Sequence, residues 1–170
     1  VSLAARATEW CFTRLIPSAI VPVTEHIARR FPRRRRVVVQ NYPLRDELLG
    51  GSSDVLTQQR SGFIYIGGIT RDRGGLEMIK AADHLAGRGH DARVQLIGPV
   101  VPPGFLEELE AAARDTPAEL LGSMPRSEVG HRLRSACASF ILFHPAPNHT
   151  NSQPNKLFEA TWCRRGPSRL

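Results

Sequence analysis

The residues best suited to chemistry lie between Asn151 and Glu159, in the order Asn-Ser-Gln-Pro-Asn-Lys-Leu-Phe-Glu. They follow an apolar run, 138–143, that is typical of a buried strand, and a polar loop, 144–150. A strand, a loop and a helix start form a natural seat for phosphate, because N–H groups of the first helical turn lack helical partners. Lys156 can meet phosphate charge there, and Glu159 can bind sugar hydroxyls. The alternative is a capped amphipathic helix with a surface ion pair.

A second candidate is the glycine-rich stretch 67–75, which follows a strand pattern and precedes a helix pattern. Glycines let the backbone come close to a ligand, and Arg71 and Arg73 can pair with phosphate oxygens. The stretch is neither the GxGxxG fingerprint of dinucleotide-binding proteins nor a P-loop, which disfavours a nicotinamide oxidoreductase. The alternative is a tight turn with surface arginines.

Strand and helix patterns alternate from residue 62 onward. The predicted strands cover 62–66, 92–97, 119–121 and 137–143, and the predicted helices cover 74–86, 103–114, 127–135 and 154–162. Alternation of this kind predicts an α/β fold with a Rossmann-like, doubly wound parallel sheet. Ligands bind such sheets beyond the carboxyl ends of the strands, where both candidate stretches fall.

The segment before residue 62 has weaker patterns. We expect a helix over 1–13, a short helix over 25–30 with Thr24 as its N-cap, and short strands over 20–23 and 37–40.

The chain is basic, with 23 Lys and Arg against 16 Asp and Glu among 170 residues. Much of the excess lies in the arginine-rich run 29–36. A positive charge favours an anionic partner, such as a nucleotide, nucleic acid or acidic lipid headgroups, although the run is also typical of a solvated linker. Aromatic residues do not alternate with the arginines, which argues against a nucleic-acid partner. The apolar run 15–23 is far shorter than the roughly 20 residues of a membrane helix, which leaves peripheral attachment to an anionic membrane open.

The cysteines and histidines do not suggest a metal or a disulfide framework. Cys11, Cys137 and Cys163 are widely spaced, as expected in a reducing compartment such as the cytoplasm. His144, His149 and Cys137 match no familiar ligand spacing, so we expect no metal and no cofactor. We expect Cys137 to be a small buried apolar residue.

Several segments, taken in order, resemble one enzyme family. The segments are Phe63-Ile-Tyr-Ile-Gly-Gly-Ile-Thr-Arg-Asp-Arg-Gly74, Val94-Gln-Leu-Ile-Gly-Pro99, Leu120-Leu-Gly-Ser-Met-Pro125 and Pro154-Asn-Lys-Leu-Phe-Glu159. The chain resembles the C-terminal, nucleotide-sugar-binding domain of GT-B fold glycosyltransferases of family 4, the glycosyl transferases group 1. The resemblance implies one half of a GT-B architecture, with its last strands missing.

The resemblance implies donor-binding roles for residues at three strand ends. Arg73 would meet the donor diphosphate, and Gly67 and Gly68 would allow close approach of the donor or acceptor. Gly122 and Met124 would lie near the nucleotide base, mainly through their backbone.

The remaining implied roles fall on the segment that begins at Asn151. Glu159 matches the second Glu of the family's Glu-x7-Glu pattern and would bind the ribose hydroxyls, whereas the first Glu is replaced by Asn151. An amide can hydrogen-bond a hydroxyl but carries no charge. Pro154 has no N–H to offer a phosphate, so Lys156 would supply positive charge in its place. No catalytic residue is assigned.

As a whole, the resemblance implies a retaining hexosyl transfer from a nucleoside-diphosphate sugar to a glycan or lipid-linked acceptor. The setting would be cell-envelope or polysaccharide biosynthesis, in the cytoplasm or at the inner face of the cell membrane. Residues 1–43 would be a remnant of the N-terminal acceptor domain and the interdomain crossover, 44–61 a linker or surface loop, 62–159 the donor domain and 160–170 an atypical tail. We expect such a fragment to be inactive alone.

Two other interpretations remain at this point. One is a non-catalytic nucleotide- or anion-binding module from a truncated gene. The other is a basic membrane- or nucleic-acid-binding domain that uses the run 29–36.

Overall fold

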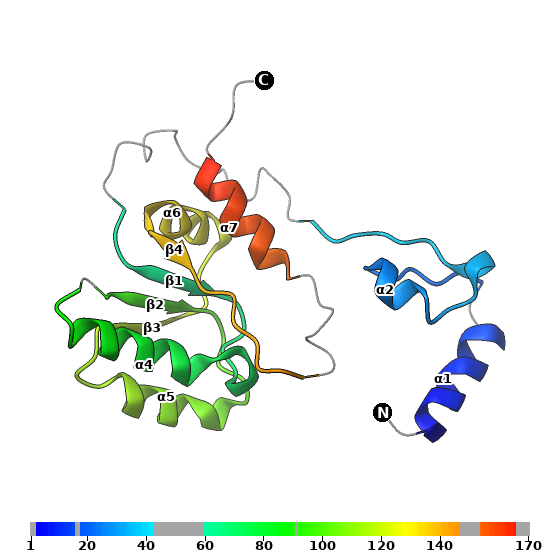
Figure 1. Ribbon diagram of the computed structural model, residues 1–170, viewed down its shortest axis with the longest axis horizontal. Coiled ribbons are helices and arrows are strands. Elements are labelled where there is room, and N and C mark those ends of the chain that lie inside the picture. Colours follow the sequence, from blue (N-terminus) through cyan, green and yellow to red (C-terminus); the bar gives the residue numbers. More distant parts are fainter. Residues whose placement is uncertain (1–2, 16–17, 43–59, 91, 147–153, 166–170) are drawn as a thin grey trace. The chain divides into compact units, whose positions relative to one another are not determined.

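A computed structural model describes residues 3–15, 18–42, 60–90, 92–146 and 154–165, and the side chains of all of these except Arg6 and residues 162–165 (Figure 1). The chain divides into two compact units, Val1–Tyr42 and Pro43–Leu170. Most of the predicted linker, 44–61, lies outside the described residues.

The described residues of the first unit form two helices and one 3-10 turn. They are α1 (Leu3–Leu15), α2 (Glu25–Ala28) and η1 (Arg33–Arg35). Thr24 caps α2 as expected, because its hydroxyl accepts a hydrogen bond of 3.3 Å from the Ile27 N–H. The predicted strands over 20–23 and 37–40 are not formed as strands. The two segments share an isolated parallel bridge between Ile20 and Arg36, and the Val37 and Val39 N–H groups donate to the Ile20 and Pro22 carbonyls at 3.0 and 3.1 Å. Pro22 interrupts the ladder because it has no N–H to donate.

The second unit is built on a parallel sheet of four strands in the order β3-β2-β1-β4. The strands are β1 (Phe63–Ile66), β2 (Val94–Ile97), β3 (Ala118–Gly122) and β4 (Ala138–Ser139). The α-helices among the described residues of this unit are α4 (Gly75–Ala86), α5 (Leu106–Ala113), α6 (Arg126–Ser135) and α7 (Asn155–Arg165). Two 3-10 turns, η3 (Arg71–Arg73) and η4 (Pro103–Phe105), precede α4 and α5.

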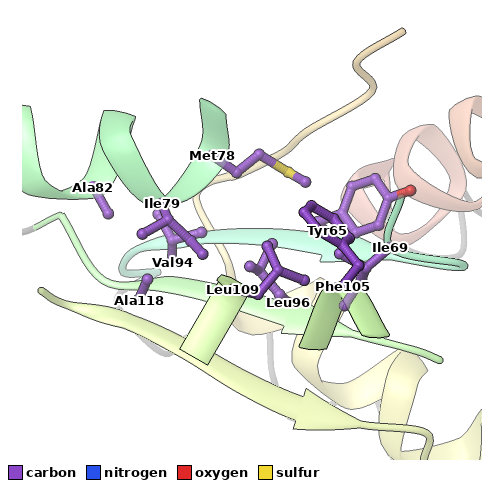
Figure 2. Close-up of a cluster of buried hydrophobic side chains, with 10 residues drawn as sticks. All are labelled: Tyr65, Ile69, Met78, Ile79, Ala82, Val94, Leu96, Phe105, Leu109 and Ala118. Atoms are coloured by element: carbon purple, nitrogen blue, oxygen red, sulfur yellow. The ribbon is translucent and has the colours of Figure 1, made fainter. Parts of the chain in front are cut away.

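Helices cover both faces of this sheet (Figure 1). Side chains of α4 and α5 pack on one face in a cluster made of Tyr65, Ile69, Met78, Ile79, Ala82, Val94, Leu96, Phe105, Leu109 and Ala118 (Figure 2). On the other face, Val129 and Leu133 of α6 pack against Ile64 and Ile97. Consecutive strand residues such as Ile64 and Tyr65 enter opposite clusters because side chains alternate along a strand. The predicted α/β, doubly wound parallel sheet is confirmed.

The last predicted strand is much shorter than expected. Within the run 137–143, only the two residues of β4 pair with β1. After them, the Phe140 N–H donates to the Ile64 carbonyl at 2.8 Å, and the run 140–143 does not continue the sheet. Leu142 instead lies against Gly74, and the His144 N–H donates to the Asp72 carbonyl at 2.7 Å. The chain therefore leaves the sheet to follow the start of α4.

The expectation for Cys137 is also wrong, because this residue is exposed. It precedes the edge strand β4, and its Sγ donates to the Arg60 carbonyl at 3.1 Å.

Two leucines of α5 offer a matched test of the core. Leu109 is fully buried, whereas Leu106 is 38% exposed. We expect Leu109→Ala to lower the free energy of unfolding by about 2–5 kcal/mol, because it leaves a cavity. Leu106→Ala should change it by less than about 0.5–1 kcal/mol. Urea titration followed by circular dichroism measures both, and equal losses would contradict this description of the core.

Candidate functional site

Three neighbouring strands end in glycines that have positive φ angles. The angles are 122° at Gly67, 134° at Gly98 and 66° at Gly122. The Gly67 N–H donates to the Ile97 carbonyl and the Gly98 N–H to the Gly122 carbonyl, both at 2.8 Å. A Cβ on Gly98 would lie 2.3 Å from the Gly67 carbonyl oxygen, so only glycine allows this approach. The carboxyl edge of the sheet is therefore largely bare backbone.

Arg73 is directed toward this edge by the turn that carries it. The Thr70 hydroxyl accepts from the Arg73 N–H at 3.1 Å and caps η3, and Gly74 ends the turn in the left-handed conformation. The Arg73 guanidinium donates through Nη1 to the Gly68 carbonyl at 3.3 Å. The Tyr65 hydroxyl donates to the same carbonyl at 2.8 Å. Arg73 thus lies over the Gly67–Gly68 turn.

Lys156 reaches the same turn from α7. Its Nζ donates to the Tyr65 hydroxyl at 2.7 Å and lies 4.0 Å from the centroid of the Tyr65 ring. A Cβ on Gly67 would lie 2.5 Å from Lys156 Cε, so the lysine occupies the space that this glycine leaves. Arg73 and Lys156 therefore converge on Gly67 and Gly68 from separate elements.

The surroundings of Lys156 make its positive charge unfavourable. Burial, and to a smaller extent the Arg73 charge, lower the pKa of Lys156 from 10.5 to about 8 against the opposing effect of Glu159. Burial also raises the pKa of Tyr65, an effect that Arg73 partly offsets. An anion beside these groups would relieve the repulsion between the two cations.

Glu159 lies one helical turn after Lys156 and is 5% exposed. Its Oε1 accepts from Arg126 Nη1 at 3.0 Å. Arg126 is the first residue of α6, so this ion pair connects α6 to α7. A buried carboxylate is tolerated in proteins when it has such a partner.

The other predicted site residues lie as follows. Gly122 is exposed at the end of β3, and its carbonyl accepts from the N–H of Gly98, which itself lies against the Gly67 carbonyl. Met124 is partly buried and packs on the cluster beneath α6. Asn151 lies outside the described residues. The structure thus brings Gly67, Gly68, Arg73 and Lys156 into direct proximity, with Glu159 on the same helix as Lys156.

Sequence reasoning missed two residues of this arrangement. Tyr65 was predicted only as part of a strand, although a buried tyrosine usually finds a partner for its hydroxyl and could have been noticed for that reason. Arg126 carries no local signal, because its partner is 33 residues away.

Arg71, which the sequence also offered as a partner for phosphate, pairs with another residue. Its guanidinium forms a two-pronged ion pair with Glu108 of α5 and lies 4.5 Å from the centroid of the Phe105 ring. Arg71 is therefore the surface arginine of this turn.

The described residues contain neither a metal-binding cluster nor a membrane-spanning helix. No three or more His, Cys, Asp or Glu side chains gather there in a way that could hold a metal ion. None of the helices in the described ranges is long and apolar enough to span a membrane. His144 instead contacts Glu77, with 3.1 Å between Nε2 and Oε1.

The fold is similar to those of two solved structures. One is WaaG, a glycosyltransferase involved in lipopolysaccharide biosynthesis, with a TM-score of 0.59 and 16% identity over 84% of this chain and 41% of that chain. The other is AviGT4, a glycosyltransferase involved in Avilamycin A biosynthesis, with a TM-score of 0.48 and 18% identity over 70% of this chain and 33% of that chain. This chain thus spans less than half the length of either.

No family model and no curated protein matches the chain. At these identities the likeness establishes the fold alone, which is the Rossmann-like arrangement of GT-B glycosyltransferases.

The pKa of Lys156 predicts a pH dependence of stability. Between pH of about 8 and 10.5 the unfolded chain holds a proton on this lysine that the folded chain has lost. The contribution of Lys156 to the free energy of unfolding should therefore rise with pH in this window. Urea titrations at pH values of about 7.5 and 10 should show that wild type gains stability relative to Lys156→Met. A constant difference between the two proteins would mean that Lys156 titrates as an ordinary lysine.

Proposed function

We propose that this chain is the donor-binding part of a glycosyltransferase. The enzyme transfers a sugar, with retention of configuration, from a nucleoside-diphosphate sugar to a glycan or lipid-linked acceptor in cell-envelope or polysaccharide biosynthesis. The observation that supports this proposal most is the convergence of Arg73 and Lys156 on the Gly67–Gly68 turn. The GT-B likeness of the fold agrees with it.

A diphosphate suits this place for three reasons. Two cationic side chains stand close together where burial weakens solvation, so a multivalent anion gains from both. The glycine edge lets an extended ligand lie directly on the backbone. Lys156 is the second residue of the 11-residue helix α7, whose N-terminal end favours negative charge.

The same groups would support the transfer step. When the glycosidic bond to the diphosphate breaks, negative charge builds up on the departing β-phosphate. Arg73, Lys156 and the start of α7 stabilise that charge more than they stabilise the intact donor, and such differential binding lowers the barrier. Glu159 binds the ribose hydroxyls, while Gly122 and Met124 lie beside the base. The reaction needs no metal and no cofactor in this proposal.

The proposed location is the cytoplasm, at the inner face of the cell membrane. The exposed arginines of η1 in the first unit support attraction to anionic lipid headgroups.

The diphosphate site can be tested with a matched control in the same turn. Arg73→Ala and Lys156→Ala should each weaken binding of UDP, GDP, ADP or dTDP by about 1.5–3 kcal/mol, the scale of charged hydrogen bonds. Arg71→Ala, which removes an identical charge two residues from Arg73, should leave the affinity within about threefold, because exposed charges act weakly. Isothermal titration calorimetry on the nucleotide that binds best measures all three.

Equal losses in all three variants would mean that the overall charge, not this site, binds the nucleotide. Unchanged affinity in both Arg73→Ala and Lys156→Ala would exclude the site.

The proposal also predicts binding without turnover by the 170-residue chain. In the GT-B arrangement the acceptor is held by a second domain, and transfer requires both substrates to be held together. We expect the chain to bind the nucleoside diphosphate and to release none from the matching nucleotide sugar in the presence of acceptor glycans. A non-catalytic module predicts the same result, so this assay tests only the inactivity of the chain alone, and release of the nucleoside diphosphate would contradict that expectation.

A further inference from the structure

The strongest unassigned feature near the site is the ion pair between Arg126 and Glu159. Among the side chains that the structure describes, Glu159 is the buried charged one, at 5% exposed. Its carboxylate contacts Arg126 through a single oxygen, Oε1, at 3.0 Å from Nη1. Arg126 itself is half exposed, so the guanidinium reaches the carboxylate from the solvent side.

We propose that Arg126 is a positioning residue that orients the Glu159 carboxylate toward the ribose hydroxyls of the bound nucleotide. This inference rests on the proposed function and extends it to the recognition of the sugar of the nucleotide. Nothing in the sequence patterns assigned a role to Arg126.

The position of Arg126 in the chain suits this role. It is the first residue of α6 and follows Pro125, whose backbone is held in an extended conformation. Met124, just before, packs on the cluster beneath α6, so the start of this helix is fixed by the core. Because the backbone at Arg126 is placed by the start of α6, its guanidinium reaches Glu159 from a defined position.

The Glu159 carboxylate has hydrogen-bond acceptor positions that its contact with Arg126 does not use. An ionised glutamate has two oxygens and about four acceptor positions, and the arginine contact uses one oxygen. Two neighbouring hydroxyls of ribose can donate to such a carboxylate. Without Arg126 the carboxylate would be a buried charge without this partner, free to turn toward Lys156 on the same helix face. That turn would remove the acceptor from the ribose hydroxyls.

The test compares nucleotides that differ only in these hydroxyls. The probe is the best binder among UDP, GDP and ADP, measured against its own 2′,3′-dideoxy counterpart by calorimetry on the whole chain. Wild type should prefer the ribonucleotide by roughly tenfold or more, as expected for hydrogen bonds to a charged group. Arg126→Ala should reduce this preference to within about threefold, and Arg126→Lys should retain most of it.

Two controls separate positioning from a general loss of structure. Arg132→Ala removes an arginine of the same helix that pairs with Glu128, and it should keep the full ribose preference. Inorganic pyrophosphate, which has no ribose, should bind Arg126→Ala within about threefold of wild type, because Arg73 and Lys156 remain. Glu159→Gln should lose the preference as Arg126→Ala does.

The outcomes distinguish this inference from the proposed function. If no nucleoside diphosphate binds wild type, the proposed function fails and the inference fails with it. If wild type discriminates and Arg126→Ala discriminates equally, the proposed function stands and Arg126 is only an ion-pair partner. Tighter ribonucleotide binding by Arg126→Ala would mean that the arginine competes for the carboxylate, which also overturns the inference. Preferential binding of dTDP over all three ribonucleotides would overturn it as well.

Discussion

The hydrogen bond from Lys156 Nζ to the Tyr65 hydroxyl joins α7 to β1 across 91 residues of sequence, and the site depends on it. The Tyr65 ring belongs to the core cluster under α4 and α5, while its hydroxyl donates to the Gly68 carbonyl (Figure 2). The position of the lysine is therefore set by the packing of the core. Residue 67 is glycine because its φ of 122° is one that other residues rarely adopt, and the lysine end occupies the space that the missing side chain leaves. If the proposed function holds, this placement preorganises the two cations for a phosphate group, and preorganisation lowers the cost of binding.

The charged side chains at the Gly67–Gly68 turn are predominantly positive. Arg73 and Lys156 face the same turn, and the nearest carboxylate on α7, Glu159, already contacts Arg126. Burial and Arg73 both lower the pKa of Lys156, which is the signature of a cation held where its charge is not fully compensated. Such an arrangement gives up some stability in the free protein. Under the proposed function, a bound di-anion would restore that stability, which is why we propose a pyrophosphate rather than a neutral sugar alone as the ligand.

Much of the fold could be predicted because a parallel sheet covered on both faces imposes a recognisable pattern. Short apolar runs such as 63–66 and 94–97 alternate with helix-length segments, and the edge rule for such sheets placed Arg73 and Lys156 together. Prediction from the sequence fails where contacts between residues far apart in the chain determine the structure. The run 140–143 is apolar enough for a strand, yet the contact of Leu142 with Gly74 draws it away from the sheet. The ion pair of Arg126 is likewise invisible to any local pattern.

The two arginines of the turn after β1 show how local geometry separates equivalent residues. Arg71 and Arg73 flank Asp72 in one 3-10 turn, where residues two apart point to different sides because the turn repeats every three residues. The Thr70 cap and the left-handed Gly74 fix the orientation of the turn. One arginine is consequently directed to Glu108 and Phe105, and the other to Gly68. Composition treats them as the same charge, whereas the backbone leaves only Arg73 at the glycine edge. The resemblance and the turn geometry, which rest on different observations, thus select the same residue.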